Sequence, residues 1–144
     1  MTTLPDQYKD AVTFAFGDSP ALADELLALV LAGKKTATCA ALRDYAAGST
    51  DKPVVGRRDV VLDGAGRPAA VIETVEIMYR RFDEVDEAFA RDEGEGAATL
   101  EQWRQDHETY FRRNGGFSPN MDLLCERFRL VESSDPKFEK RVKS

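Results

Sequence analysis

A long run of alternating side chains over residues 68–79 dictates much of the fold. Its even-numbered and odd-numbered positions form two sets rich in apolar and β-branched residues, and this period of two is typical of a β-strand. A shorter apolar run over residues 59–62 precedes it, with Asp63-Gly64-Ala65-Gly66 between the two. Glycines at these positions suit a tight turn. We therefore predict an antiparallel hairpin in the middle of the chain.

Three helices are expected around this hairpin. Ser19 followed by Pro20 is a strong helix start, because a capping side chain precedes a proline at the first helical position. Gly33 ends that helix. Residues 82–91 carry apolar side chains at helical spacing, and a third helix follows the capping residue Thr99.

Two more strands are expected, at residues 36–42 and 123–131. Strands and helices thus alternate irregularly, with no internal repeat and no interior linker. This order predicts one α+β domain over residues 1–132. Residues 133–144 are polar and charged and are expected to form a frayed tail.

Composition narrows the class of protein. The two cysteines, Cys39 and Cys125, are too few for a disulfide framework and are expected to be free thiols of a cytoplasmic protein. The first residues lack the basic and apolar regions of a signal peptide. The longest apolar run, residues 26–32, is too short to cross a membrane. We expect no membrane partner, and a homodimer is one possible oligomeric state.

The net charge of −6 argues against tight, sequence-independent binding to long nucleic acid, which depends on an excess of Lys and Arg. The acidic residues are concentrated between positions 83 and 101. Basic residues gather in three pairs elsewhere: Lys34/Lys35, Arg57/Arg58 and Arg80/Arg81. A local basic cleft would suit a short or small anionic ligand.

The segment Gly33-Lys34-Lys35-Thr36-Ala37-Thr38 is the strongest candidate site. It is not a nucleotide-binding P-loop, because Ala28 occupies the position of the first glycine and the segment follows a helix. Lysines at a helix C-terminus also complement the helix dipole, which explains one lysine. Lys35 and Thr38 remain as residues that can project into one cavity, with Lys34 beside them for substrate binding.

His107 is the single histidine of the chain. No second ligand stands at helical or hairpin spacing from it, so we expect no metal site. A structural role, proton transfer and base stacking together with Trp103 all remain open for this residue. Glu93 precedes Gly94 where a helix breaks, so its side chain can turn inward.

Together these motifs resemble those of an ASCH-domain protein of the longer bacterial branch. The matching segments are Gly33-Lys34-Lys35-Thr36-Ala37-Thr38, Phe82-Asp83-Glu84-Val85, Ala90-Arg91-Asp92-Glu93-Gly94, Trp103-x-x-x-His107-x-x-x-Phe111, Phe117-Ser118-Pro119 and Cys125-Glu126-Arg127-Phe128. The resemblance implies a fold of the PUA-like superfamily, a small and mostly antiparallel β-barrel with flanking helices. It also implies association with RNA, and hydrolytic activity in some branches.

Two catalytic arrangements follow from this resemblance. In a shorter amidohydrolase branch, a lysine, a threonine and a glutamate hydrolyse N4-acylated cytidine, and these roles fall on Lys35, Thr38 and Glu93. That branch has an arginine where this chain has Ala40. In the longer branch, metal-independent RNA cleavage uses lysine, tyrosine and serine side chains.

In this sequence the lysine of that second arrangement corresponds to Lys35 or Lys52, the tyrosine to Tyr45 and the serine to Ser118. A Glu93 side chain near Lys35 would favour the charged lysine. A charged lysine suits the binding of a phosphate or an oxyanion, with Glu93 as the base.

We therefore expect an RNA-binding or nucleoside-binding hydrolase, ribonuclease-like and without cofactor or metal. An amidohydrolase of acylated cytidine and a non-catalytic RNA-binding module are the alternatives. In addition to the catalytic candidates, the residues expected to contact the substrate are Lys34, Lys52, Arg57, Arg58, Trp103 and His107.

Overall fold

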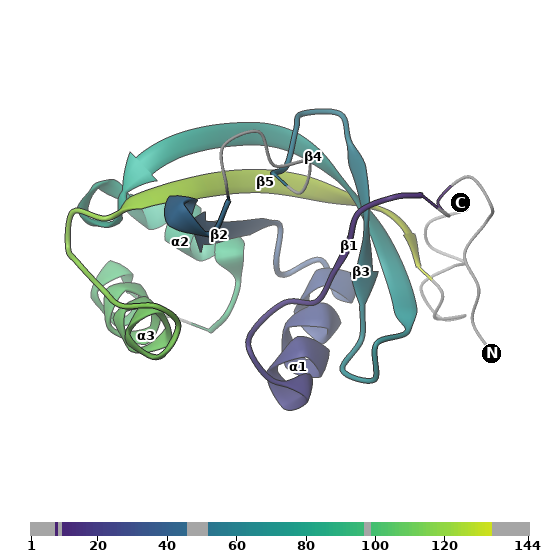
Figure 1. Cartoon of the computed structure of the whole chain (residues 1–144), viewed down its shortest axis with the longest axis horizontal. Coiled ribbons are helices and arrows are strands. Elements are labelled where there is room, and N and C mark those ends of the chain that lie inside the picture. Colours follow the sequence, from purple (N-terminus) through teal and green to yellow (C-terminus); the bar gives the residue numbers. More distant parts are fainter. Residues whose placement is uncertain (1–7, 9, 46–51, 97–98, 134–144) are drawn as a thin grey trace.

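The computed structural model describes residues 8, 10–45, 52–96 and 99–133. Five strands form one sheet: β1 (Thr13–Phe14), β2 (Ala37–Ala41), β3 (Arg58–Leu62), β4 (Pro68–Arg81) and β5 (Asp122–Ser133). Their order is β1-β3-β4-β5-β2, with β1 parallel to β3 and every other pair antiparallel. The expected hairpin is formed by β3 and β4. Figure 1 shows that β4 and β5 run side by side as a long curved ribbon.

The sheet is open, so the α+β class is confirmed but the expected closed barrel is not found among the described strands. The two edge strands explain this. β1 is two residues long and pairs with β3, whereas β2 pairs with β5. One edge of β2 therefore has no partner strand in the described part of the chain.

Three helices and two single turns complete the fold: α1 (Pro20–Leu31), α2 (Glu87–Glu93), α3 (Leu100–Arg113), and the 3-10 turns η2 (Leu42–Asp44) and η3 (Phe82–Glu84). Ser19 Oγ accepts a hydrogen bond from the Leu22 amide at 3.1 Å, which confirms the start of α1. Thr99 caps α3 in the same way. The helix expected at residues 82–91 is divided, because Asp86 caps a new helix after η3.

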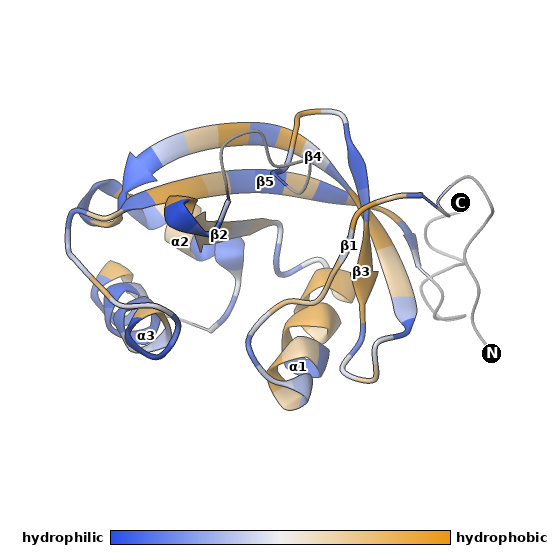
Figure 2. Cartoon of the chain, viewed as in Figure 1, coloured by the Kyte–Doolittle hydropathy of each residue, from blue (hydrophilic) through white to orange (hydrophobic). Residues whose placement is uncertain are grey.

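The helices α1 and α3 lie on the same side of the β4–β5 ribbon and apart from one another (Figure 1). Figure 2 shows that α1 is mostly apolar, whereas α3 is mostly hydrophilic. Each contributes to a different core cluster. Leu26 and Val30 of α1 pack with residues of β3 and β4, and Trp103 and Phe111 of α3 pack with residues of α2, β2 and β5.

The described helices include none with the length and apolar character that a membrane crossing needs. Ser133, expected in the charged tail, is instead the last residue of β5. Residues 134–144 of that tail lie outside the described residues.

Candidate active site

Lys35 is buried immediately after α1. Its side chain has no exposed surface, and Nζ donates to the carbonyl oxygen of Ala37 at 2.9 Å and to that of Glu93 at 3.4 Å. Nζ also forms ion pairs with Glu93 Oε1, at 3.8 Å, and with Glu95 Oε2. A buried ammonium is costly unless it is paired and hydrogen-bonded. The two carboxylates are therefore what makes this position tenable for a lysine.

Gly94 allows α2 to approach the Lys35 segment closely. It has a φ of 64°, and a Cβ atom there would clash with the carbonyl oxygen of Lys34. The Thr36 amide donates to the carbonyl oxygen of Asp92 at 2.8 Å, which fastens the end of α2 to the same segment. Glu93 is the last residue of α2, so this contact places its carboxylate beside Lys35.

Both ring nitrogens of His107 face acceptors. Nδ1 lies 2.9 Å from the carbonyl oxygen of Trp103, and Nε2 lies 3.1 Å from Glu93 Oε1. A carbonyl and an ionised carboxylate only accept hydrogen bonds, so both contacts are hydrogen bonds when the ring carries a proton on each nitrogen. Burial opposes the charged form, but the charge and hydrogen bond of Glu93, the charge of Glu95 and the contact with the Trp103 carbonyl together outweigh it and raise the pKa of His107 above 6.5.

The two carboxylates beside Lys35 have opposite pKa shifts. Burial alone would favour neutral Glu93, but the charges of Lys35 and His107 lower its pKa to about 2. Burial raises the pKa of Glu95; the charge of Lys35 offsets part of this, and the charge of Glu93 adds to it. Glu95 is therefore the more basic carboxylate of the pair.

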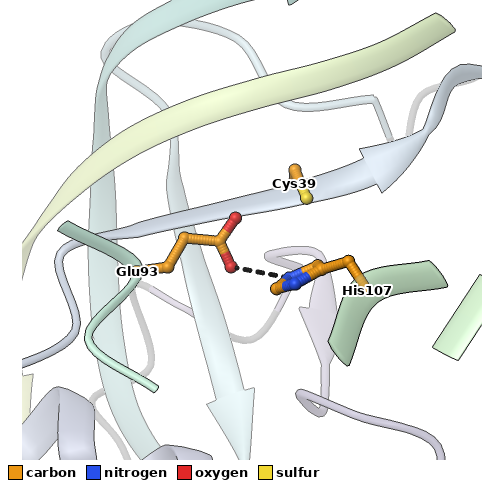
Figure 3. A group of neighbouring side chains, drawn as sticks. All are labelled: Cys39, Glu93 and His107. Carbon is orange, nitrogen blue, oxygen red and sulfur yellow. Dashed lines mark hydrogen bonds and ion pairs between the residues drawn. The ribbon is translucent and has the colours of Figure 1, made fainter. Parts of the chain in front are cut away.

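Cys39 on β2 completes the group (Figure 3). Its Sγ, a carboxylate oxygen of Glu93 and a ring nitrogen of His107 all lie within 4.8 Å of one another. Burial and the charge of Glu93 raise the pKa of the Cys39 thiol well above its usual value. Oε2 of Glu93 is buried and has no hydrogen-bond partner among the described residues.

Two cavities meet along β2. One of about 220 Å³ lies between α1 and α3, and Glu93, Glu95 and His107 are in its wall. The other, of about 260 Å³, extends toward β1 and Tyr45. Residues that line both are Phe16, Gly17, Thr38, Cys39 and Tyr110. Volumes of a few hundred Å³ suit a small ligand.

The charged residues of the smaller cavity are mostly acidic. They are Glu93, Glu95, Asp106, His107 and Arg113. The guanidinium of Arg113 is already bound to Asp18, with Nε 2.6 Å from Oδ2. A ligand with a phosphate would therefore meet carboxylates here, whereas a neutral ligand would not be repelled.

Comparison with known proteins decides the family, since a model described as the ASCH domain matches residues 12–132. The chain belongs to the ASCH-domain family. A protein from Enterococcus faecalis, known from a crystal structure, is 33% identical in sequence to this chain. The match covers 88% of this chain and 79% of that protein's chain, with a TM-score of 0.78. An ASCH domain from Lactobacillus crispatus is 28% identical over 87% and 82% of the two chains, with a TM-score of 0.76. No curated protein sequence matches the chain.

This ASCH domain brings together four residues named from the sequence. Thr38 lines both cavities, and Glu93 and His107 line the smaller one. Lys35 lies behind Glu93 and is not in the wall of either cavity. Its ammonium contacts the carboxylates of Glu93 and Glu95, which do line the smaller cavity.

The residues expected for RNA cleavage are more dispersed. Tyr45 lines the larger cavity, and burial, with the nearby charge of Glu126, raises its pKa to about 12. Ser118 donates to Asn120 and lines neither cavity. The ASCH domain thus separates Ser118 from the Lys35 group.

Most residues expected to bind substrate have other partners or lie elsewhere. Arg57 Nε is 2.7 Å from Asp59 Oδ1, and Arg58 Nε is 3.1 Å from Glu73 Oε1. Lys52 Nζ lies over the ring of Tyr79, 4.8 Å from its centroid. Trp103 is buried and stacks on His107, with ring centroids 4.1 Å apart. Lys34 is exposed and lines neither cavity.

Sequence reasoning missed Glu95 and Cys39 as members of this site. The signal for Glu95 is its place between Gly94 and Gly96, which both have positive φ and so turn the chain back toward Lys35. Cys39 is adjacent to Thr38 on β2, and successive strand residues point to opposite faces. The face on which each lies depends on the register with β5.

Proposed function

We propose that this ASCH domain is a hydrolase of a neutral, nucleoside-sized amide. The observation that carries the proposal is the acidic wall of the smaller cavity, with Glu95 and a protonated His107 on one ligand space. N4-acylated cytidine is the substrate suggested by the resemblance to the amidohydrolase branch. This choice replaces RNA cleavage as the leading activity.

Amide hydrolysis needs a base for water and an acid for the leaving nitrogen. Glu95 is suited to accept the proton of the attacking water, because its pKa is raised. The water oxygen bonds to the carbonyl carbon, the carbon–nitrogen bond breaks, and His107 supplies a proton to the nitrogen. The products are a carboxylate and the free amine.

The other residues of the group position these two. Glu93 is ionised and holds His107 through the 3.1 Å contact, while Lys35 holds both carboxylates. Thr38, in the wall of both cavities, is suited to hydrogen-bond the ligand. Backbone groups of β2 that face away from β5, apart from the Ala37 carbonyl oxygen that Lys35 binds, are further donors and acceptors, because in the described part of the chain no strand pairs with that edge.

The paired arginines also favour a small substrate over RNA. RNA binding depends largely on cations that contact phosphates. The guanidinium groups of Arg57, Arg58 and Arg113 are each in an ion pair with a carboxylate. Releasing them to contact RNA would cost those ion pairs.

The test is an incubation of the purified protein, in EDTA, with N4-acetylcytidine and separately with mixed RNA. We expect cytidine and acetate from the first and no fragments from the second. Cleavage of RNA without release of acetate would replace this proposal with the ribonuclease. Saturable, salt-dependent RNA binding without turnover of either substrate would indicate the non-catalytic RNA-binding module instead.

A further inference from the structure

We propose that Cys39 Sγ, the Glu93 carboxylate and His107 Nε2 form a Zn²⁺ site in the wall of the smaller cavity. These ligand types, one thiolate, one imidazole and one carboxylate, are those that zinc prefers. Cys39 lies on β2, Glu93 at the end of α2, and His107 within α3. Their side chains converge (Figure 3). This site goes beyond the proposed hydrolysis, which needs no metal.

The spacing of the three groups is close to that of a zinc centre. Bonds of about 2.0–2.3 Å in a tetrahedron separate ligand atoms by roughly 3.3–3.7 Å. The three ligand atoms lie within 4.8 Å of one another, and His107 Nε2 and Glu93 Oε1 are already 3.1 Å apart. Metal binding therefore requires the side chains to rotate until the remaining separations reach that range.

The surroundings orient the ligands. His107 Nδ1 donates to the carbonyl oxygen of Trp103, and a metal-binding histidine commonly makes such a bond with its other nitrogen. Stacking on Trp103 fixes the plane of the ring. Glu93 Oε2 is buried and meets no hydrogen-bond criterion among the described residues, although the neighbouring Cys39 thiol contributes to the lowered pKa of Glu93.

Charge balance also permits the ion. A thiolate and a carboxylate neutralise Zn²⁺, and the ammonium of Lys35 retains its ion pair with Glu95. The three ligands all line the smaller cavity, so a fourth position faces the ligand space and can be filled by water. Sulfur and nitrogen donors exclude Mg²⁺ and Ca²⁺, which prefer oxygen.

Zinc at this position would inhibit the proposed hydrolysis. It would replace the Nε2 proton of His107 and bind the carboxylate that orients the ring. This consequence rests on the proposed function, whereas metal binding itself does not.

The test uses reduced, EDTA-stripped protein without a histidine tag. Titration with Co²⁺, a spectroscopic substitute for Zn²⁺, is expected to give a thiolate-to-metal charge-transfer band at one ion per chain, which Zn²⁺ then removes. Because His107 is the single histidine, its ring NMR signals should shift with the same stoichiometry. Cys39→Ser is expected to abolish the band, and Cys39→Ser or His107→Gln to weaken Zn²⁺ binding at least about tenfold.

Cys125→Ser is the matched control, because Cys125 lies opposite Cys39 on β5 but is not one of the three ligands. We expect it to keep the band and the affinity, with circular dichroism confirming that all variants fold. No band in the wild type, or equal binding by folded Cys39→Ser protein, would overturn the site. Zinc binding without any hydrolysis of acetylcytidine by the metal-free protein would overturn only the proposed function.

Discussion

His107 Nε2 lies 3.1 Å from Glu93 Oε1, and this contact joins α3 to the end of α2 inside the protein. Fourteen positions separate the two residues in the sequence. The pair favours the charged form of a mostly buried histidine. It also fixes the carboxylate that Lys35 approaches from the opposite direction.

The protonation of His107 can be measured directly in the metal-free protein. We expect a pKa above 6.5, because Glu93 stabilises the imidazolium. The contribution of this pair to stability is then fully present below pH 6.5 and is lost as the pH rises through the raised pKa. An NMR titration of the single histidine, carried out in EDTA, measures the pKa of His107. Glu93→Gln should lower this pKa. An unchanged pKa in that variant would mean that Glu93 is not the cause.

Lys35→Met is expected to destabilise the fold by about 3–5 kcal/mol, because it leaves two carboxylates close together in a buried site. Urea unfolding measures the loss. The double variant Lys35→Met/Glu95→Gln should recover part of it, since one of the two charges is then removed. Equal stability of the single and double variants would contradict the pairing.

Gly94→Ala is expected to cost about 2 kcal/mol or more. Alanine is strained at positive φ, and its Cβ would also meet the carbonyl oxygen of Lys34. Gly33→Ala is the matched control, because Gly33 has a φ of 78° and nothing within 4 Å of an added Cβ. A larger loss of unfolding free energy for Gly94→Ala than for Gly33→Ala would isolate the contact from the backbone strain.

Glu95→Gln should lower kcat/KM for acetylcytidine by about 10²–10⁴, the usual contribution of a general base. Glu101→Gln changes an exposed carboxylate in the first turn of α3 and should have little effect. Initial rates of acetate release compare the two. If both variants remain fully active, Glu95 is not the base.

The thiols are expected to be slow to react in the native protein. Burial raises the pKa of Cys125 to about 12 and that of Cys39 well above its usual value, and the thiolate is the reactive form. A thiol-specific chromogenic reagent at neutral pH should react slowly with Cys39, which lines both cavities, should not react with buried Cys125 before unfolding, and should react quickly with both afterwards. Rapid labelling of Cys125 in folded protein would show that this thiol is less shielded than the structure indicates.

Local signals made the helices and the hairpin predictable. The Ser19–Pro20 start, the cap at Thr99 and the glycine turn before β4 each depend on residues close in sequence. The break between η3 and α2 was missed, because apolar spacing alone continues across Asp86. Barrel closure, which is not found among the described strands, could not be judged from local signals because the pairing of edge strands is a property of the whole sheet.

The site was predictable only in part, because it too depends on contacts between distant parts of the chain. Lys35, Thr38 and Glu93 carry recognisable residue types at glycine-marked turns. That Glu95 approaches Lys35, and that Ser118 does not, follows from contacts between segments far apart in the chain. The position of Cys39 beside His107 likewise depends on the packing of β2 against α3.

The pairing of β2 with β5 has a consequence for biosynthesis. Ala37 pairs with Arg127, and Ala41 with Leu123, so β2 has no partner strand until β5 has been made. Nearly the whole domain must leave the ribosome before Thr38 and Cys39 have a fixed place. Shortened chains that end before β5 should therefore bury neither Lys35 nor its carboxylates, and the site is expected only once β5 is present.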